Sequence, residues 1–246
     1  MKKIILLFLI SITVISCQIT ERFVLNESGA VNYETEIDFS EMMGFMSSSK
    51  ADSLGDFGKF PIDTIIRFSE VEKLDDFKLD SISDADREFL KSMDKTDVRI
   101  QMDENIGKMS IMINEKNVTD FNSYLKKMND SYMKLMKEDS ETGDKLSELG
   151  LINPLEIQYD GKTFQRKMTN DLKSVISEAG DSVFSEMSQM LNMFTYKLEY
   201  HFPKKIKNSS IEEATYSLDG KVMTIEGSLT ELKEDPEKYN FTVEFE

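Results

Sequence analysis

Hydrophobic and polar residues alternate along much of this chain. The clearest run covers residues 31–39, where every second side chain (Val31, Tyr33, Thr35, Ile37, Phe39) is apolar or β-branched and Asn32, Glu34, Glu36 and Asp38 lie between them. This alternation predicts a strand with one buried and one wet face, which is typical of antiparallel sheets. Residues 19–27 supply a preceding arm, so the sequence predicts a hairpin that turns at Ser28 and Gly29.

Further hairpins follow from the same period of two residues. Their predicted arms are 98–102 with 109–113, 155–159 with the segment around Phe164, and 214–218 with 222–226. The Asp-Gly-Lys sequences at 160–162 and 219–221 favour tight turns at the last two. Alternation over residues 196–202 predicts a single strand that is ended by Pro203. Alternation over residues 241–245 predicts a closing strand at the carboxyl terminus.

Helical periodicity is clearest over residues 121–136, where Phe121, Tyr124, Leu125, Met128 and Tyr132 share one stripe. Shorter helices are predicted after Ser40 (with Met42, Met43 and Met46), at 85–93, 143–150 and 229–239, and over 170–192. Residues 47–64 are predicted to form a loop, and Ser69 with Glu72 is interpreted as a capping box.

The combination predicts an α+β fold: a curved, mainly antiparallel sheet of roughly eight to ten strands, built from hairpins, with helices packed on one face. We expect residues 18–246 to form a single extracytoplasmic domain. The alternative is two stacked subdomains divided near Asn153.

The first seventeen residues have a different composition. Lys2 and Lys3 precede an apolar run, 4–14, that is too short for a permanent membrane span, and the segment closes on Val14-Ile15-Ser16-Cys17. That ending resembles the lipobox of bacterial lipoproteins. The resemblance implies that residues 1–16 are a signal peptide removed on export and that Cys17 becomes a diacylglyceryl cysteine. An ordinary secretory signal, or an uncleaved anchor with an incidental cysteine, is the alternative.

A second resemblance involves both ends of the chain. The lipobox, the hairpin with Gly29 and the closing stretch YKLEYHFPKKIK, followed by YSLDGKVMTIEG, are together similar to uncharacterised envelope lipoproteins of the Bacteroidota, and the closing stretch by itself is similar to LppM-type lipoprotein domains. The shared features are a strand, a proline and an Asp-Gly-Lys turn. The resemblance implies an envelope location, with the outer membrane expected, and contact with lipids; it transfers no catalytic residue.

Composition narrows the possible functions. The formal charge is -16 and becomes -18 once Lys2 and Lys3 are removed, so we expect no nucleic-acid partner. Cys17 is the single cysteine, which leaves no disulfide, thiolate metal site or cysteine nucleophile after acylation. Lys204, Lys205 and Lys207 form a dense basic cluster, interpreted as an edge that blocks strand pairing rather than a contact for acidic headgroups.

Candidate chemistry is sparse, and we expect no catalytic residue, metal or cofactor. His201 is the single histidine and falls on the polar side of its strand, where a solvated role is common. Asp80, Asp84 and Asp86 are weak calcium candidates because their spacing is not that of an EF-hand. Thioether ligands for copper are offered by Met187, Met190 and Met193, although the first two share an apolar helix stripe and suit a flexible core.

The function that these features favour is a non-enzymatic envelope lipoprotein, held at a membrane by Cys17, that binds an apolar ligand or an envelope protein. The many Met and Phe side chains suit adaptable apolar contacts. A carboxylate-based hydrolase of the cell envelope is the alternative, which a cleft with two carboxylates of shifted pKa would support.

Overall fold

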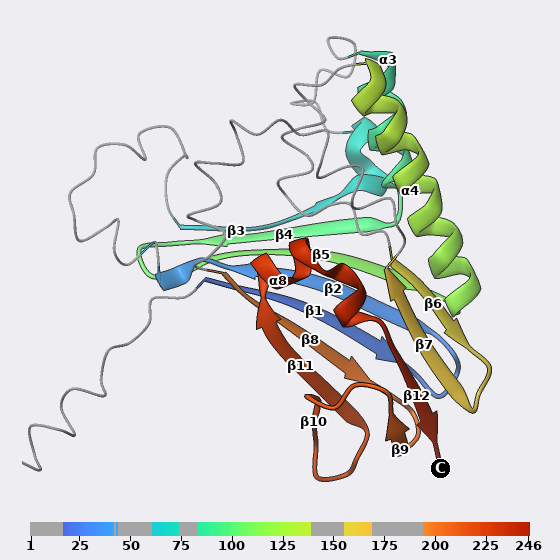
Figure 1. Cartoon of the computed structure of the whole chain (residues 1–246). Coiled ribbons are helices and arrows are strands. Elements are labelled where there is room, and N and C mark those ends of the chain that lie inside the picture. Colours follow the sequence, from blue (N-terminus) through green and yellow to red (C-terminus); the bar gives the residue numbers. More distant parts are fainter. Residues whose placement is uncertain (1–16, 42, 44–60, 74–82, 139–154, 169–193) are drawn as a thin grey trace, which may run out of the picture.

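The computed structural model describes residues 17–41, 43, 61–73, 83–138, 155–168 and 194–246 (Figure 1). Its strands are β1 (Cys17–Leu25), β2 (Val31–Asp38), β3 (Ile62–Arg67), β4 (Thr96–Met102), β5 (Gly107–Glu115), β6 (Leu155–Tyr159), β7 (Thr163–Met168), β8 (Phe194–His201), β9 (Ile206–Ser209), β10 (Thr215–Tyr216), β11 (Val222–Ser228) and β12 (Phe241–Phe245). The helices are α3 (Asp84–Ser92), α4 (Val118–Glu138), α8 (Leu229–Glu234) and the 3-10 helices η2 (Phe68–Lys73) and η4 (Pro236–Tyr239).

The strands form two sheets. Sheet A has eight strands in the order β10-β11-β8-β1-β2-β5-β4-β3, and sheet B has four in the order β6-β7-β12-β9. Neighbouring strands are antiparallel except for β1 and β8, which run parallel in the middle of sheet A. The architecture is therefore α+β with mainly antiparallel sheets, as the alternating sequence predicts.

The two faces of sheet A differ in burial at β1. Alternate residues of β1 show this: Phe23 and Leu25 are buried on the inner face, whereas Arg22 and Val24 on the outer face are half-buried. The inner face packs against sheet B and α4, and aromatic rings make these contacts. Phe23 meets Phe121 of α4 with ring centroids 5.6 Å apart and Phe164 of β7 at 5.4 Å. One hydrophobic core thus joins both sheets and the long helix.

The hairpins and helices follow the sequence closely. Gly29, Gly161 and Gly220 have positive φ at three of the turns, a conformation that glycine adopts without strain. Asn117 precedes α4, and its side-chain oxygen accepts the backbone N–H of Asp120 at 2.8 Å, which caps the helix. None of the described helices combines the length and the apolar character needed to cross a membrane.

Two local predictions are wrong. Residues 62–64 belong to β3 rather than to the loop expected over 47–64, because the alternation of Ile62, Thr64 and Ile66 fits one face of the sheet. The 3-10 helix η2 begins at Phe68, so Ser69 lies inside it and is not its cap. The capping box of this region is formed by Ser83 and Asp86 at the start of α3.

Several predictions lie outside the described residues. They concern residues 1–16, Met42, Met46, residues 47–60, Asp80, the helices at 143–150 and 170–192, and Met187, Met190 and Met193.

Candidate functional site

The inner face of sheet A carries a second group of apolar side chains that is not part of the main core. Met43, Val98 and Ile111 are buried but do not belong to the hydrophobic cluster that joins the two sheets. Half-buried side chains surround them on β2, β4 and β5 and on the residue after β2. We call this set the apolar patch: Ile37, Phe39, Met43, Val98, Ile100, Met102, Met109 and Ile111.

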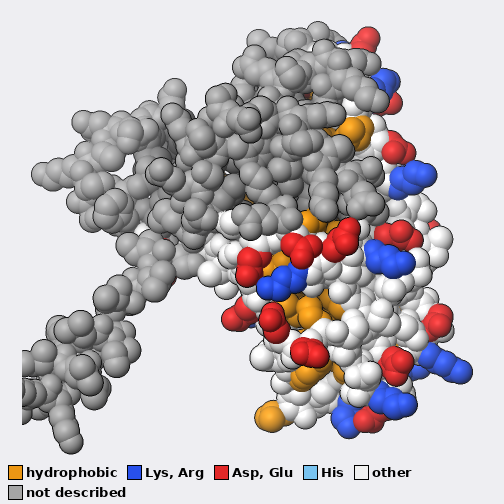
Figure 2. All heavy atoms as spheres, viewed as in Figure 1, with side chains coloured by type: hydrophobic (Ala, Val, Ile, Leu, Met, Phe, Trp, Pro, Cys, Tyr) orange, Lys and Arg blue, Asp and Glu red, His pale blue; other side chains and the backbone are white. Residues whose placement is uncertain are grey.

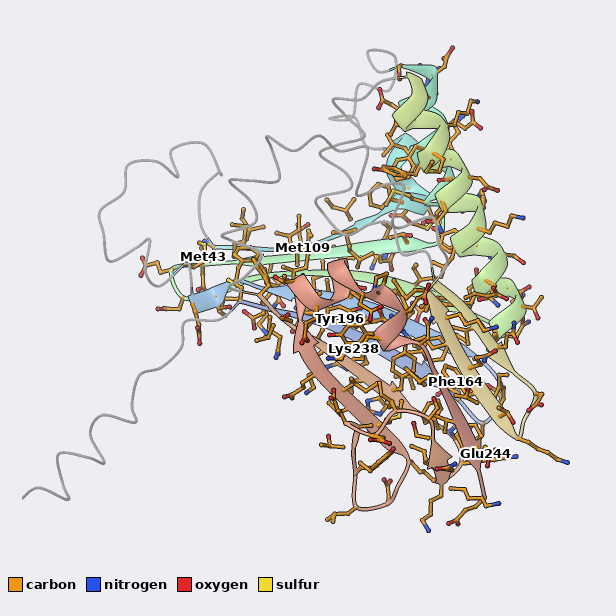
Figure 3. The ribbon with its side chains drawn as sticks, viewed as in Figure 1. Met43, Met109, Phe164, Tyr196, Lys238 and Glu244 are labelled. Carbon is orange, nitrogen blue, oxygen red and sulfur yellow. The ribbon has the colours of Figure 1, made fainter. Side chains whose placement is uncertain are left out.

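Strand register explains why these residues meet. Ile37 of β2 pairs with Met109 of β5, and Met109 pairs with Ile100 of β4, so one row crosses three strands. Val98 and Ile111 are paired in the adjacent row on the same face. Figure 3 shows Met43 and Met109 toward one end of sheet A, whereas Phe164 of β7 lies in sheet B, far from these two methionines. The apolar patch and the main core therefore occupy different halves of one inner face.

A helical turn closes one end of the patch. The backbone N–H of Phe39 donates to the carbonyl of Gly107 at 2.8 Å, and the Ser40 hydroxyl accepts the Gly107 N–H at 3.1 Å. A Cβ built on Gly107 would lie 2.5 Å from the Phe39 ring and 2.6 Å from Met43 Cγ. Glycine is therefore required at position 107 for Phe39 and Met43 to fold over the start of β5.

A charged pair is buried deep in the other half of the inner face. Arg166 of β7 donates through Nη2 to Oε2 of Glu21 in β1 at 3.1 Å, and both side chains are almost completely inaccessible. Nη1 of Arg166 donates to the backbone carbonyl of Tyr239 at 3.0 Å. The hydroxyls of Tyr196 and Tyr200 both donate to the Glu21 carboxylate. The pair connects sheet A, sheet B and η4.

Electrostatics keep this pair ionised. Burial works to raise the pKa of the Glu21 carboxyl, but the Arg166 charge and the hydrogen bonds from Arg166, Tyr200 and Tyr196 outweigh burial and hold that pKa below its ordinary value. Burial alone would lower the pKa of Arg166, but the neighbouring Glu21 carboxylate raises it well above its usual range. The Glu21 carboxylate therefore has neither access to solvent nor a proton to donate, which suits a structural connection rather than acid catalysis.

The outer face of sheet A carries a separate, half-exposed network. Arg22 bridges Glu34 at 2.8 Å and Glu199 at 3.0 Å across three neighbouring strands. His201 Nε2 lies 2.7 Å from Glu199 Oε1. Partial burial acts to raise the pKa of Glu199, but hydrogen bonds with His201 and Arg22 prevail and lower it to about 2. This carboxylate stays charged at neutral pH, unlike the raised-pKa acid that a glycosidase needs.

The structure places several residues that the sequence offered as candidates for a site or a basic cluster: His201, Asp84, Asp86 and Lys207. His201 lies on the outer, polar face as its alternation predicts, and it contacts Glu199. Asp86 accepts the Ser83 N–H and completes a capping box, and exposed Asp84 lies 3.5 Å from Arg87. Within the described ranges no three His, Cys, Asp or Glu side chains converge as a metal site would require. Lys207 lies in β9, an outermost strand of sheet B.

Sequence reasoning missed the Glu21–Arg166 pair, although a signal was present. Glu21 interrupts the apolar series Ile19, Phe23 and Leu25 on one side of β1, and Arg166 shares its side of β7 with Phe164. A charged residue at an inward position of an alternating strand indicates a buried partner, because an unpaired buried charge is costly. The identity of that partner, 145 residues away, is not encoded locally.

Comparison with known proteins adds little to this picture. No family model matches the chain, and no curated protein matches it. Among solved structures, the NMR structure of the folded domain of LppM from Mycobacterium tuberculosis is similar at a TM-score of 0.40 and 11% identity, over 94% of this chain and 89% of that chain. A likeness of this degree assigns no function to this chain.

Proposed function

We propose that this protein is a membrane-anchored envelope lipoprotein that binds an apolar ligand on the apolar patch of sheet A without chemically altering it. The observation that carries the proposal is the division of the inner face: one half packs into the main core, and the other holds the eight side chains of the apolar patch, three buried and five half-buried, outside that core. Half-buried apolar groups that are not tied into a core favour binding of a nonpolar molecule or surface.

The side chains of the patch suit an acyl chain. Met43, Met102 and Met109 are flexible and polarisable, so they adapt to a ligand without a fixed shape. The charged groups on β2 and β5 point the other way: Lys108 reaches Glu36 and Asp38 on the outer face, at 3.3 and 2.8 Å. Apolar burial, at about 25 cal/mol per Å² of buried surface, would therefore provide most of the affinity.

The proposed anchor lies beside the patch. Cys17 is the first residue of β1, and Ile19, two residues later, pairs with Ile37 of the patch. Cys17 and Ile19 are on the same side of β1 by alternation. A diacylglyceryl group on Cys17 would begin next to the apolar patch, with no linker between the lipid and the sheet. This arrangement supports a membrane lipid or its acyl chain as the ligand class.

Ligand binding is tested with the full-length chain and radiolabelled palmitate. Met109→Glu places a carboxylate at the centre of the patch and is expected to weaken binding by at least about tenfold, equivalent to 1.4 kcal/mol. Val24→Glu is the matched control, because Val24 is also half-buried but lies on the outer face of β1. Equal affinity in both variants, or no binding by the parent chain, contradicts the proposal.

Anchoring is tested separately. Cys17→Ala is expected to abolish incorporation of labelled fatty acid and to retain the precursor, since the sulfur is the proposed site of lipid attachment. Normal labelling of that variant would refute lipidation at Cys17. The palmitate-binding result would stand independently of this outcome.

A further inference from the structure

The outermost strands of the two sheets differ in how they are protected from pairing. β10 has two residues, which is too short to template another strand. β9 carries Lys207, and lysine on an edge discourages pairing. The side-chain amide of Asn122 in α4 binds both the N–H and the carbonyl of Ile157 in β6, at 3.0 and 2.6 Å. Three of the four outermost strands are therefore blocked.

β3 is the fourth outermost strand and lacks each of these features. It is six residues long, contains no proline or lysine, and pairs with β4 along its whole length without a register shift. Among the described residues no strand pairs with its other edge. Asp63, Thr64, Ile65 and Arg67 are exposed, and Ile65 is 42% exposed. A regular, exposed edge of six residues that is rich in β-branched side chains is a template for a further strand.

The sequence of β3 is complementary to itself. If two copies pair antiparallel with Ile65 opposite Ile65, then Asp63 of each copy faces Arg67 of the other. These residues are separated by even numbers, so both charges and Ile65 lie on the same face of the combined sheet. Arg67 has no ion pair within the described ranges, although Asp63 already accepts two hydrogen bonds from Arg99. Opposite charges directly across an antiparallel pair stabilise it.

We infer that β3 is a self-association surface, at which two copies of this chain join their eight-stranded sheets edge to edge about a twofold axis through Ile65. Such an interface is isologous, since each copy contributes the same strand to the other. The inference is independent of the ligand proposed for the patch, because Ile65, Asp63 and Arg67 lie on the outer face.

Disulfide trapping tests the register. Residues directly opposite in an antiparallel pair have Cα atoms about 4.5–5.5 Å apart, which is within the range that a disulfide spans. Full-length Ile65→Cys, oxidised in intact expressing cells, is expected to give a covalent homodimer. Ile106→Cys is the matched control, because Ile106 is 39% exposed but lies in the β4–β5 turn. The parent chain, which has Cys17 alone, controls for trapping through that residue.

The interface is tested separately by Ile65→Lys, which places two ammonium groups face to face at the axis. In detergent, sedimentation of the full-length parent is expected to show a dimer; Ile65→Lys is expected to weaken it by at least tenfold, and Ile106→Lys to leave it unchanged. A monomeric parent chain, equal trapping at positions 65 and 106, or trapping of Ile65→Cys to a different protein would each overturn the inference.

Discussion

The Glu21 carboxylate and the Arg166 guanidinium form an ion pair at 3.1 Å in the middle of the hydrophobic core, with both side chains at or below 1% exposure. The two residues belong to different sheets and lie 145 positions apart. Their remaining polar atoms are satisfied by Tyr196, Tyr200 and the backbone of Tyr239. Sheet B is therefore fixed to sheet A by a directional contact as well as by apolar packing.

Breaking this pair from one side should be costly. Arg166→Met leaves the Glu21 carboxylate buried without its counter-charge, and we expect a loss of about 3–5 kcal/mol in the free energy of unfolding, measured by urea denaturation. Glu21→Gln should cost a similar amount, because it leaves the buried guanidinium uncompensated. The double variant should be more stable than the sum of the two losses predicts, since neither charge then remains.

An exposed ion pair provides the control for that experiment. Arg99 contacts Asp63 at 3.0 Å on the outer face, where both side chains are largely exposed. Arg99→Gln should therefore destabilise the fold far less than Arg166→Met. If the two substitutions cost the same, the Glu21–Arg166 pair is not the connection that we infer.

The packing of η4 on β11 predicts a strong effect at Gly227. A Cβ at this position would overlap the hydroxyl of Tyr239. Gly227→Ala should lower the free energy of unfolding by about 1–3 kcal/mol, because the ring must move out of a packed site. Adding Tyr239→Phe removes the overlapping oxygen and should restore part of the loss, as measured by thermal denaturation. An unchanged or larger loss in the double variant would exclude this steric explanation.

Much of the fold could be predicted because it depends on local patterns. Alternation identified the hairpin of β1 and β2, and the 3.6-residue period identified α4. Glycine residues in the sequence marked the turns at Gly29, Gly161 and Gly220, and each of them has a positive φ in the structure. These signals are contained within short segments, so a single sequence is sufficient to recognise them.

The features that could not be predicted are long-range. Nothing near β1 indicates that its second neighbour is the parallel strand β8. The contact between Arg22 of β1 and Glu199 of β8 joins residues that are 177 positions apart. The division into sheets of eight and four strands follows from that pairing. The apolar patch has the same origin: Ile37, Met109 and Ile100 each belong to an unremarkable alternating strand, and only the register places them in one row.

The outer-face network predicts a dependence of stability on pH. The folded-state pKa of Glu199 is about 2, below the ordinary value of 4.5. A depressed folded pKa gives stability that is fully present above pH 4.5 and is lost as the pH falls from 4.5 toward 2. Glu199→Gln should be less stable than the parent at pH 7, and the difference should shrink through this window. Urea denaturation at several pH values measures it; a constant difference would contradict the assignment.

The hydrogen bonds between Asn122 of α4 and Ile157 of β6 predict that the edge of β6 opens locally when they are removed. Asn122 replaces a missing strand partner, since its side chain accepts the N–H of Ile157 and donates to the Ile157 carbonyl. Asn122→Leu keeps the approximate size but removes both hydrogen bonds, so we expect a loss of about 1–3 kcal/mol and faster hydrogen exchange of the Ile157 amide.

Asn122→Asp separates the two hydrogen bonds. A carboxylate still accepts from the Ile157 N–H but cannot donate to its carbonyl, so amide protection should persist while some global stability is lost. Asn114→Leu is the matched control, because Asn114 is exposed on the outer face and binds the side chain of Asn32 rather than a strand edge. Protection of Ile157 should be unaffected there. If the amide exchanges equally fast in the parent and in Asn122→Leu, the side chain does not protect this edge, and β6 would be as open to pairing as β3.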